Sequence, residues 1–125
     1  MPKQTDFENT FKKLRAILKV YEPKLILVVD EPNHYALETP HVMKNKHRVY
    51  FAGVKIGKSY VSYHLMPMYA LEELRNAMSP ELKKRMQGKS CFNFSKPDEK
   101  LFKELAKLTG IGFKRFTSKD FYSKL

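Results

Sequence analysis

Residues 49–66 read VYFAGVKIGKSYVSYHLM, two apolar and aromatic runs on either side of Gly57-Lys58. Runs of this length that are rich in Val, Ile, Tyr and Phe are typical of β-strands. Glycine at the first central position of a two-residue loop favours a type II′ hairpin turn. The sequence therefore predicts a β-hairpin in which Ile56 pairs with Ser59.

This register divides the hairpin into two faces, because side chains alternate along a strand. One face is nearly all apolar and should pack against helices; it carries Tyr50, Ala52, Val54, Ile56, Val61, Tyr63 and Leu65. The second face is amphipathic and carries Phe51, Tyr60, Ser62, His64 and Met66. Ligand sites combine an apolar wall with a few polar groups. We therefore expect the second face to bind a ligand, with Cys91 and Asn93 joining it from a later strand.

Helical segments flank the hairpin on both sides. Apolar residues recur at helical spacing in 6–20 and in 98–116, which predicts a helix near each end of the chain. A shorter helix is predicted at 69–77. Another should begin at Ser79-Pro80, a capping residue followed by proline at the favoured first position, and end near Gly88.

Extended segments account for the rest of the chain. Branched apolar residues at 24–30, the run at 35–38 and the segment 89–94 are typical of strands, whereas 40–47 is polar and turn-like. Together with the hairpin, they predict an α+β fold. We expect a two-layer sandwich, with an antiparallel sheet of about five strands and the N- and C-terminal helices packed on one face.

Size and cysteine content predict a single domain that works in the cytoplasm. The chain has 125 residues, the usual size of one domain, so we expect one domain over 1–125, with the first few residues and the tail from about 117 loosely held. Cys91 is the one cysteine, which excludes an intramolecular disulfide and favours a reducing compartment. No apolar run approaches the roughly 18 residues of a membrane span, and the polar start of the sequence leads us to expect no secretory signal. We expect no membrane association and a monomer or weak homodimer.

The charge is strongly positive, with 24 basic and 13 acidic residues and a net charge of +11. Residues 1–78 carry 12 basic and 8 acidic residues, and residues 79–125 carry 12 and 5. Such a field attracts phosphates and acidic partners. A basic patch precedes Phe92 and Phe94 and consists of Lys83, Lys84, Arg85 and Lys89. Basic groups beside exposed aromatic rings can bind single-stranded nucleic acid, whereas a solvated lysine-rich surface needs no partner.

No catalytic motif is complete in this sequence. Cys91 and His64 would converge if the last strand lies beside the hairpin, and such a pair can activate a thiolate; a buried core cysteine is the other interpretation. Carboxylates and an imidazole suit iron or manganese, but the group around 30–38 lacks tight ligand spacing; it contains Asp30, Glu31, His34 and Glu38. We therefore assign no catalytic residue, metal ligand or cofactor.

Two strings resemble the YdhG-like domain family of bacterial proteins. They are GKSYVSYHLMP at 57–67 and SPELKKRMQGKSCFNF at 79–94, the latter followed by Asp98-Glu99 and a helix with leucine and phenylalanine. The resemblance extends over 14–116. It implies a small α+β sandwich with helices on one face of an antiparallel sheet. It implies little about activity, since much of the family consists of domains of unknown function.

One class within that family is frataxin-like and is linked to iron delivery, so iron handling is an alternative function. Frataxins rely on acidic residues along the first helix, whereas residues 6–20 here are mainly basic, with Asp6 and Glu8 against Lys12, Lys13, Arg15 and Lys19. The leading expectation is a non-enzymatic YdhG-like domain that binds a small molecule or a protein through the second hairpin face. Weak nucleic-acid binding through the basic patch is the other alternative.

Overall fold

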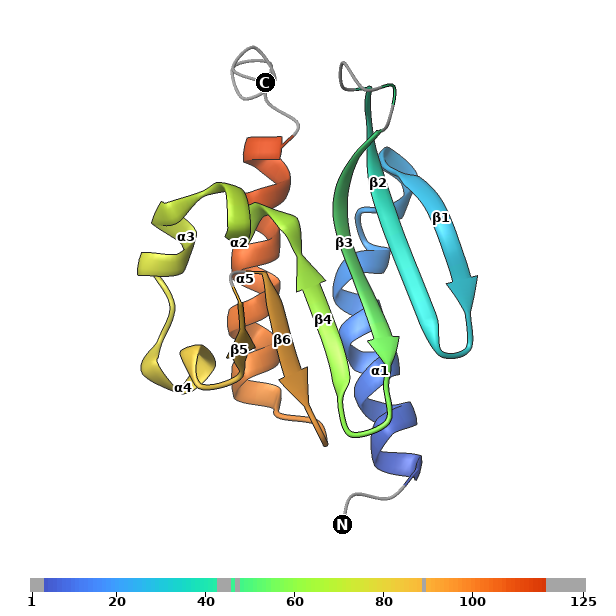
Figure 1. The fold of residues 1–125 in the computed structure, drawn as a ribbon, viewed down its shortest axis with the longest axis vertical. Coiled ribbons are helices and arrows are strands. Elements are labelled where there is room, and N and C mark those ends of the chain that lie inside the picture. Colours follow the sequence, from blue (N-terminus) through green and yellow to red (C-terminus); the bar gives the residue numbers. More distant parts are fainter. Residues whose placement is uncertain (1–3, 43–45, 47, 89, 117–125) are drawn as a thin grey trace.

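The computed structural model describes residues 4–42, 46, 48–88 and 90–116. Within this part of the chain, six strands form one antiparallel sheet in the order β1-β2-β3-β4-β6-β5 (Figure 1). The strands are β1 Ile26–Glu31, β2 His34–Val42, β3 Arg48–Ile56, β4 Val61–Leu65, β5 Met86–Gln87 and β6 Cys91–Phe94. The predicted α+β class is confirmed, and the two-residue strand β5 adds an edge to the expected sheet.

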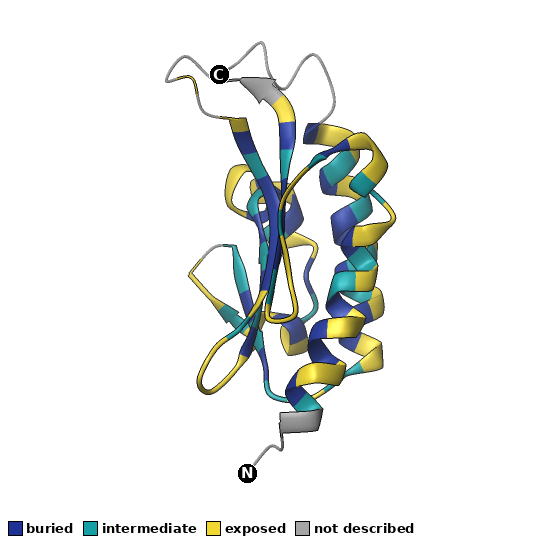
Figure 2. Ribbon diagram, turned by 90° about the vertical axis from the view of Figure 1, so that its right-hand side faces the viewer, coloured by how far each residue is buried: buried dark blue, intermediate teal, exposed yellow. Residues whose placement is uncertain are grey.

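Two long helices, α1 Gln4–Lys19 and α5 Glu99–Phe116, pack side by side on the same face of the sheet (Figures 1 and 2). They run in the same direction (Figure 1). An ion pair between Lys13 and Glu99 joins them near the start of α5, and the ring of Tyr21 stacks on Phe113 near its end. Among the described helices, none is both long and apolar enough to cross a membrane.

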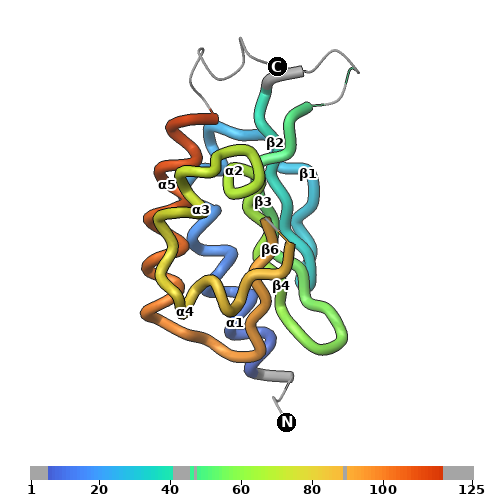
Figure 3. Tube along the Cα trace, turned by 60° about the vertical axis from the view of Figure 1, so that its left-hand side comes forward, coloured from blue at the N-terminus to red at the C-terminus, as the bar shows by residue number. Residues whose placement is uncertain are grey.

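The remaining helical segments are short: η1 Glu22–Lys24, α2 Met66–Ala70, α3 Glu72–Asn76 and α4 Pro80–Lys83. Figure 3 shows α2, α3 and α4 following one another beside α5. The helix predicted at 69–77 is divided into α2 and α3, because Leu71 has an extended backbone and its side chain is buried. Ser79 caps α4 as predicted, since its Oγ accepts a hydrogen bond from the Leu82 N–H at 3.2 Å.

Several element boundaries differ from the prediction. Helix α4 ends at Lys83 rather than near Gly88, because Met86 and Gln87 pair with β6 instead. Gly88 nevertheless has the expected left-handed conformation, with φ of 71°. Strand β2 extends to Val42 and so includes part of the segment predicted as a turn. The rest of that segment, at 43–45 and 47, lies outside the described residues, as do 1–3 and 117–125.

The hydrophobic core fills the space between the sheet and the two long helices. Figure 2 shows α1 and α5 with buried residues toward the sheet and exposed residues on the opposite side. The largest fully buried side chains come from both layers: Tyr35, Phe51, Tyr63, Phe92, Phe94 and Phe116. Inside this core the Thr109 hydroxyl donates to the Leu105 carbonyl at 2.7 Å, so the Tyr63 hydroxyl donates to Thr109 Oγ1 at 2.6 Å.

The β3–β4 hairpin forms with a longer loop than predicted. Ile56 pairs with Val61 rather than with Ser59, so four residues, 57–60, connect the strands. The Gly57 N–H donates to the Tyr60 carbonyl at 2.8 Å and closes this loop. The predicted two-residue turn is therefore wrong. The observed register of β3 against β4 differs from the predicted one by two residues. Because side chains alternate with a period of two, β4 keeps its predicted faces.

A β-bulge in β3 reverses the predicted faces at one end of the hairpin. Leu37 pairs with Ala52 and Glu38 pairs with Tyr50, so Phe51 is the extra residue on β3. Phe51 therefore points into the core, where its ring contacts Tyr21, Phe113 and Phe116. Tyr50 lies instead on the opposite face of the sheet, with its ring centroid 5.0 Å from that of His64. The predictions for Phe51 and Tyr50 are both wrong for this reason.

Candidate functional site

Four of the predicted site residues come together on the sheet face that points away from α1 and α5, here called the outer face. Strand β6 lies beside β4, so that Ser62 pairs with Asn93 and His64 pairs with Cys91. The Ser62 hydroxyl donates to Asn93 Oδ1 at 2.8 Å, and Asn93 Nδ2 donates to Gln87 Oε1 at 2.8 Å. These three side chains therefore form a continuous row of hydrogen bonds across the neighbouring strands β4, β6 and β5.

His64 is held by two contacts on the outer face. Its Nε2 lies 2.9 Å from the Ser90 hydroxyl, and its ring packs against Tyr50. Burial lowers the pKa of His64, because the imidazolium loses hydration in this position. Burial, together with the negative potential of Cys91 and Glu38, raises the pKa of Tyr50 above its ordinary value. Both rings are therefore uncharged at neutral pH, and the outer face is polar without being ionised at these two positions.

The lowered pKa of His64 predicts a pH-dependent stability. As the pH falls below about 6.5, the unfolded chain binds a proton at residue 64 that the folded protein does not yet accept. The free energy of unfolding should therefore decrease with falling pH until the pH lies below the folded-state pKa of His64. Urea denaturation of the protein and of His64→Gln at several pH values measures this, and the difference between the two should change in that window. A difference independent of pH would contradict the burial of His64.

The other predicted site residues lie elsewhere. Phe51 is fully buried on the helix side of the sheet, for the reason given above. Tyr60 lies in the β3–β4 loop, not on a strand, and is 51% exposed. Met66 begins α2 and packs against the core. The expected continuous site on one hairpin face is therefore reduced to Ser62, His64, Cys91 and Asn93.

The predicted basic patch is exposed at the end of α4. Lys83, Lys84 and Arg85 are all exposed, and Lys89 lies outside the described residues. A pocket of about 410 Å³ next to the patch contains two of these cations and the N-terminus of α5; it is lined by Glu81, Lys84, Arg85, Asp98, Lys100 and Leu101. Phe92 and Phe94 are buried in the core, so they offer no stacking surface to a base beside this patch.

Two of the three carboxylates grouped with His34 are engaged in ion pairs. Asp30 accepts from Arg15 and Glu38 accepts from Arg48, each at 3.0 Å. Among the described residues, no three histidine, cysteine, aspartate or glutamate side chains gather as the ligands of a metal ion would. Iron handling therefore stays an untested prediction.

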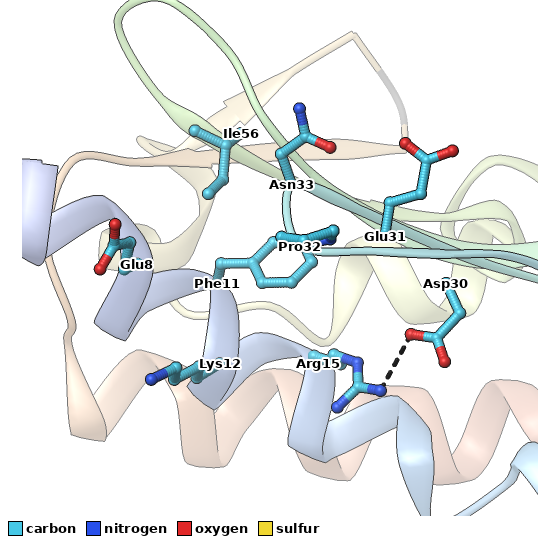
Figure 4. Close-up of a pocket in the computed structure, with 9 residues that line it drawn as sticks. All are labelled: Glu8, Phe11, Lys12, Arg15, Asp30, Glu31, Pro32, Asn33 and Ile56. Carbon is cyan, nitrogen blue, oxygen red and sulfur yellow. Dashed lines mark hydrogen bonds and ion pairs between the residues drawn. The ribbon is translucent and has the colours of Figure 1, made fainter.

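A pocket that the sequence analysis missed lies between α1 and the turn that joins β1 to β2, and it is here called the α1 pocket (Figure 4). Its volume is about 810 Å³, and its lining consists of Glu8, Phe11, Lys12, Arg15, Asp30, Glu31, Pro32, Asn33 and Ile56. Residues 8, 12 and 15 share one side of α1, because helical neighbours recur at three and four residues. Asn33 is held in place because its carbonyl accepts from the Ile56 N–H at 2.9 Å.

Arg15 forms a fixed wall of the α1 pocket. Its Nη2 donates to Asp30 Oδ1 at 3.0 Å, as drawn in Figure 4, and its guanidinium lies 4.9 Å from the ring centre of Tyr35. The Tyr35 hydroxyl in turn donates to Glu22 at 2.7 Å, and burial next to this carboxylate raises the pKa of Tyr35. Arg15 and Asp30 thus neutralise each other within one network.

The remaining charges of the α1 pocket have both signs. No ion pair joins Glu8, Lys12 or Glu31 to another residue of the described chain. With Arg15 and Asp30 neutralised, the lining carries one positive and two negative groups. Phe11, Pro32 and Ile56 supply apolar surface between them (Figure 4). The pocket can therefore contact an ammonium group, an acidic group and a hydrocarbon body at once.

Comparison of the chain with known protein families, curated proteins and solved structures finds no match. The class of this protein therefore rests on its fold and surface: a basic α+β sandwich with one helix-covered sheet face and a charged pocket at the edge of the helical layer.

Proposed function

We propose that this protein is a non-enzymatic module that binds a small zwitterionic molecule with an apolar body in the α1 pocket. The observation that carries the proposal is the combination, in one pocket, of an apolar surface with unpaired side chains of opposite charge. A volume of about 810 Å³ also falls within the range of roughly 300–1,000 Å³ that is typical of ligand pockets.

Each part of the ligand has a partner in this arrangement. The carboxylate or phosphate of the ligand pairs with Lys12, and its ammonium group pairs with Glu8 or Glu31. Its hydrocarbon part covers Pro32 and Ile56, where buried apolar area contributes about 25 cal/mol per Å². A free amino acid with a large side chain is the simplest molecule with these three features.

The local charge supports a zwitterion over a simple anion. The protein carries +11, so a plain anion would be attracted to many surfaces. The lining of the α1 pocket, in contrast, includes three carboxylates, Glu8, Asp30 and Glu31, against two cations. It also contains no histidine, cysteine or serine, so we propose binding rather than nucleophilic chemistry.

Titration of ¹⁵N-labelled protein with L-phenylalanine tests the proposal. The backbone amides of Asn33 and Ile56 should shift, because both residues line the α1 pocket. Lys12→Gln should weaken binding by about tenfold, as expected for loss of one charge-assisted contact. Lys19→Gln, an exposed lysine near the end of the same helix, is the matched control and should bind as the native chain does. Shifts confined to other residues, or equal effects of both variants, would exclude the α1 pocket.

Membership of the YdhG-like family and a cytoplasmic location belong to the same proposal. The strings at 57–67 and 79–94 support the family, and the helices on one face of an antiparallel sheet agree with the fold that it implies. The single cysteine, Cys91, supports a reducing compartment.

A further inference from the structure

A second surface, beyond the C-terminal end of α1, has a different chemistry. A groove of about 530 Å³ lies between α5 and the segment around η1. It is lined by Tyr21, Lys24, Ala106, Lys107, Gly110, Ile111, Phe113 and Lys114, and is here called the α5 groove. Its lining contains three lysines and no acidic residue, in contrast to the α1 pocket.

The positive charge of the α5 groove continues along the helix. Lys100, Lys103, Lys107 and Lys114 share one side of α5, because their spacing follows the helical repeat. The distance along the axis from Lys100 to Lys114 is about 21 Å at 1.5 Å per residue. This length is sufficient for contacts with several phosphates of one nucleic-acid strand.

Carboxylates on the neighbouring elements are engaged elsewhere. Glu22, next to Lys24 in η1, accepts from the Tyr35 hydroxyl. Glu99 pairs with Lys13, and Glu104 accepts from both the N–H and the hydroxyl of Ser79 at 2.7 Å. Of these carboxylates, Glu99 is neutralised by Lys13, and the lining of the α5 groove itself carries three lysines and no carboxylate, so its own charge is positive.

The floor of the α5 groove is apolar. Tyr21 and Phe113 stack on each other with ring centroids 4.6 Å apart, which fixes one wall. Ala106 and Gly110 are small, so the helix surface between the lysines is shallow. Ile111 is 38% exposed, so its side chain adds accessible apolar surface to this floor. A planar base can therefore rest on this floor while its phosphates contact the lysines.

We infer that the α5 groove binds single-stranded nucleic acid, independently of the ligand proposed for the α1 pocket. The lysines along α5 bind the phosphates of one nucleic-acid strand, and the apolar floor accepts an unstacked base. A duplex keeps its bases stacked inside and so cannot use that floor. The basic patch at Lys83, Lys84 and Arg85 has charge without an adjacent exposed ring, which makes it the weaker site.

Fluorescence anisotropy with a short labelled oligothymidylate at several salt concentrations tests this inference on the full chain. Lys24→Gln combined with Lys107→Gln should weaken binding by about tenfold at low salt and reduce the slope of log K against log salt by about 1.4, as for two lost phosphate contacts. Lys83→Gln combined with Lys84→Gln removes the same charge from α4 and should have a clearly smaller effect. Circular dichroism verifies that both variants fold, and all four lysines are exposed.

A third variant separates base contacts from phosphate contacts. Ile111→Ser should weaken oligothymidylate binding several-fold without changing the salt slope, because it removes apolar floor and no charge. Equal losses in the two lysine pairs would overturn the inference. So would unchanged binding by Ile111→Ser, equal affinity for duplex DNA, or equal competition by polyglutamate, which would identify an acidic polypeptide as the partner.

Discussion

Replacement of Phe51 by alanine is expected to lower the free energy of unfolding by about 3–5 kcal/mol, the usual cost of deleting a buried phenylalanine ring. Phe51 is fully buried, and its ring contacts Tyr21, Phe113 and Phe116 in edge-on geometries. The variant therefore leaves a cavity at the junction of β3 with the ends of both long helices. Urea denaturation monitored by far-UV circular dichroism measures the change.

Tyr60→Ala is the matched control for this experiment. The alternating pattern places Phe51 and Tyr60 together on the second face, but in the structure Tyr60 is in a loop and exposed. Its removal should change the free energy of unfolding by no more than about 0.5 kcal/mol, as for other surface substitutions. Similar costs for the two variants, or a cost below about 1 kcal/mol for Phe51→Ala, would contradict the β-bulge in β3.

Gly53→Ala should be the second most damaging single change, with an expected loss of about 2–3 kcal/mol from overpacking. A Cβ at Gly53 would overlap the Tyr50 hydroxyl and lie 2.9 Å from the Tyr35 carbonyl oxygen. The first neighbour is the end of a side chain, but the second is backbone of β2 and cannot move without disturbing the ladder. Thermal and urea unfolding of the variant provide the measurement.

A double-mutant cycle identifies which neighbour is responsible. Tyr50→Phe removes the hydroxyl that meets the new methyl group, so the combined variant should recover part of the lost stability. Gly57→Ala is the control, because a Cβ there lies 3.3 Å from the Tyr60 carbonyl oxygen in an exposed loop. No recovery in the combined variant would assign the whole cost to the Tyr35 carbonyl. A loss below that of Gly57→Ala would contradict the close approach at Gly53.

Local patterns were sufficient for the fold class but not for the hairpin in detail. Alternation in 49–66 predicts two strands and their order, and β4 keeps its predicted faces because the register error is two residues. The bulge at Phe51 depends on packing against Phe113 and Phe116, residues more than sixty positions away. The alternation of side chains along a strand contains no information about such contacts. It therefore places Tyr50 and Phe51 on the wrong faces.

The candidate sites show the same limit. Ser62, His64, Cys91 and Asn93 could be placed together because two strands with alternating patterns carry them. The α1 pocket could not, since it joins one side of α1 to the turn at Pro32 and Asn33 and to Ile56 of β3. The spacing of Glu8, Lys12 and Arg15 was a usable signal, but a charged helix face by itself indicates only exposure to water.

The pairing of α1 with α5 has a consequence for biosynthesis. All six strands follow α1 in the chain and are made before α5. While the chain is being translated, the apolar side chains of β3, β4 and β6 therefore have only one of their two covering helices. Contacts such as Tyr21 with Phe113 join residues far apart along the chain and must form late. The nascent chain therefore depends on protection from aggregation until α5 has emerged from the ribosome, and deletion of this helix would leave the same surface permanently exposed.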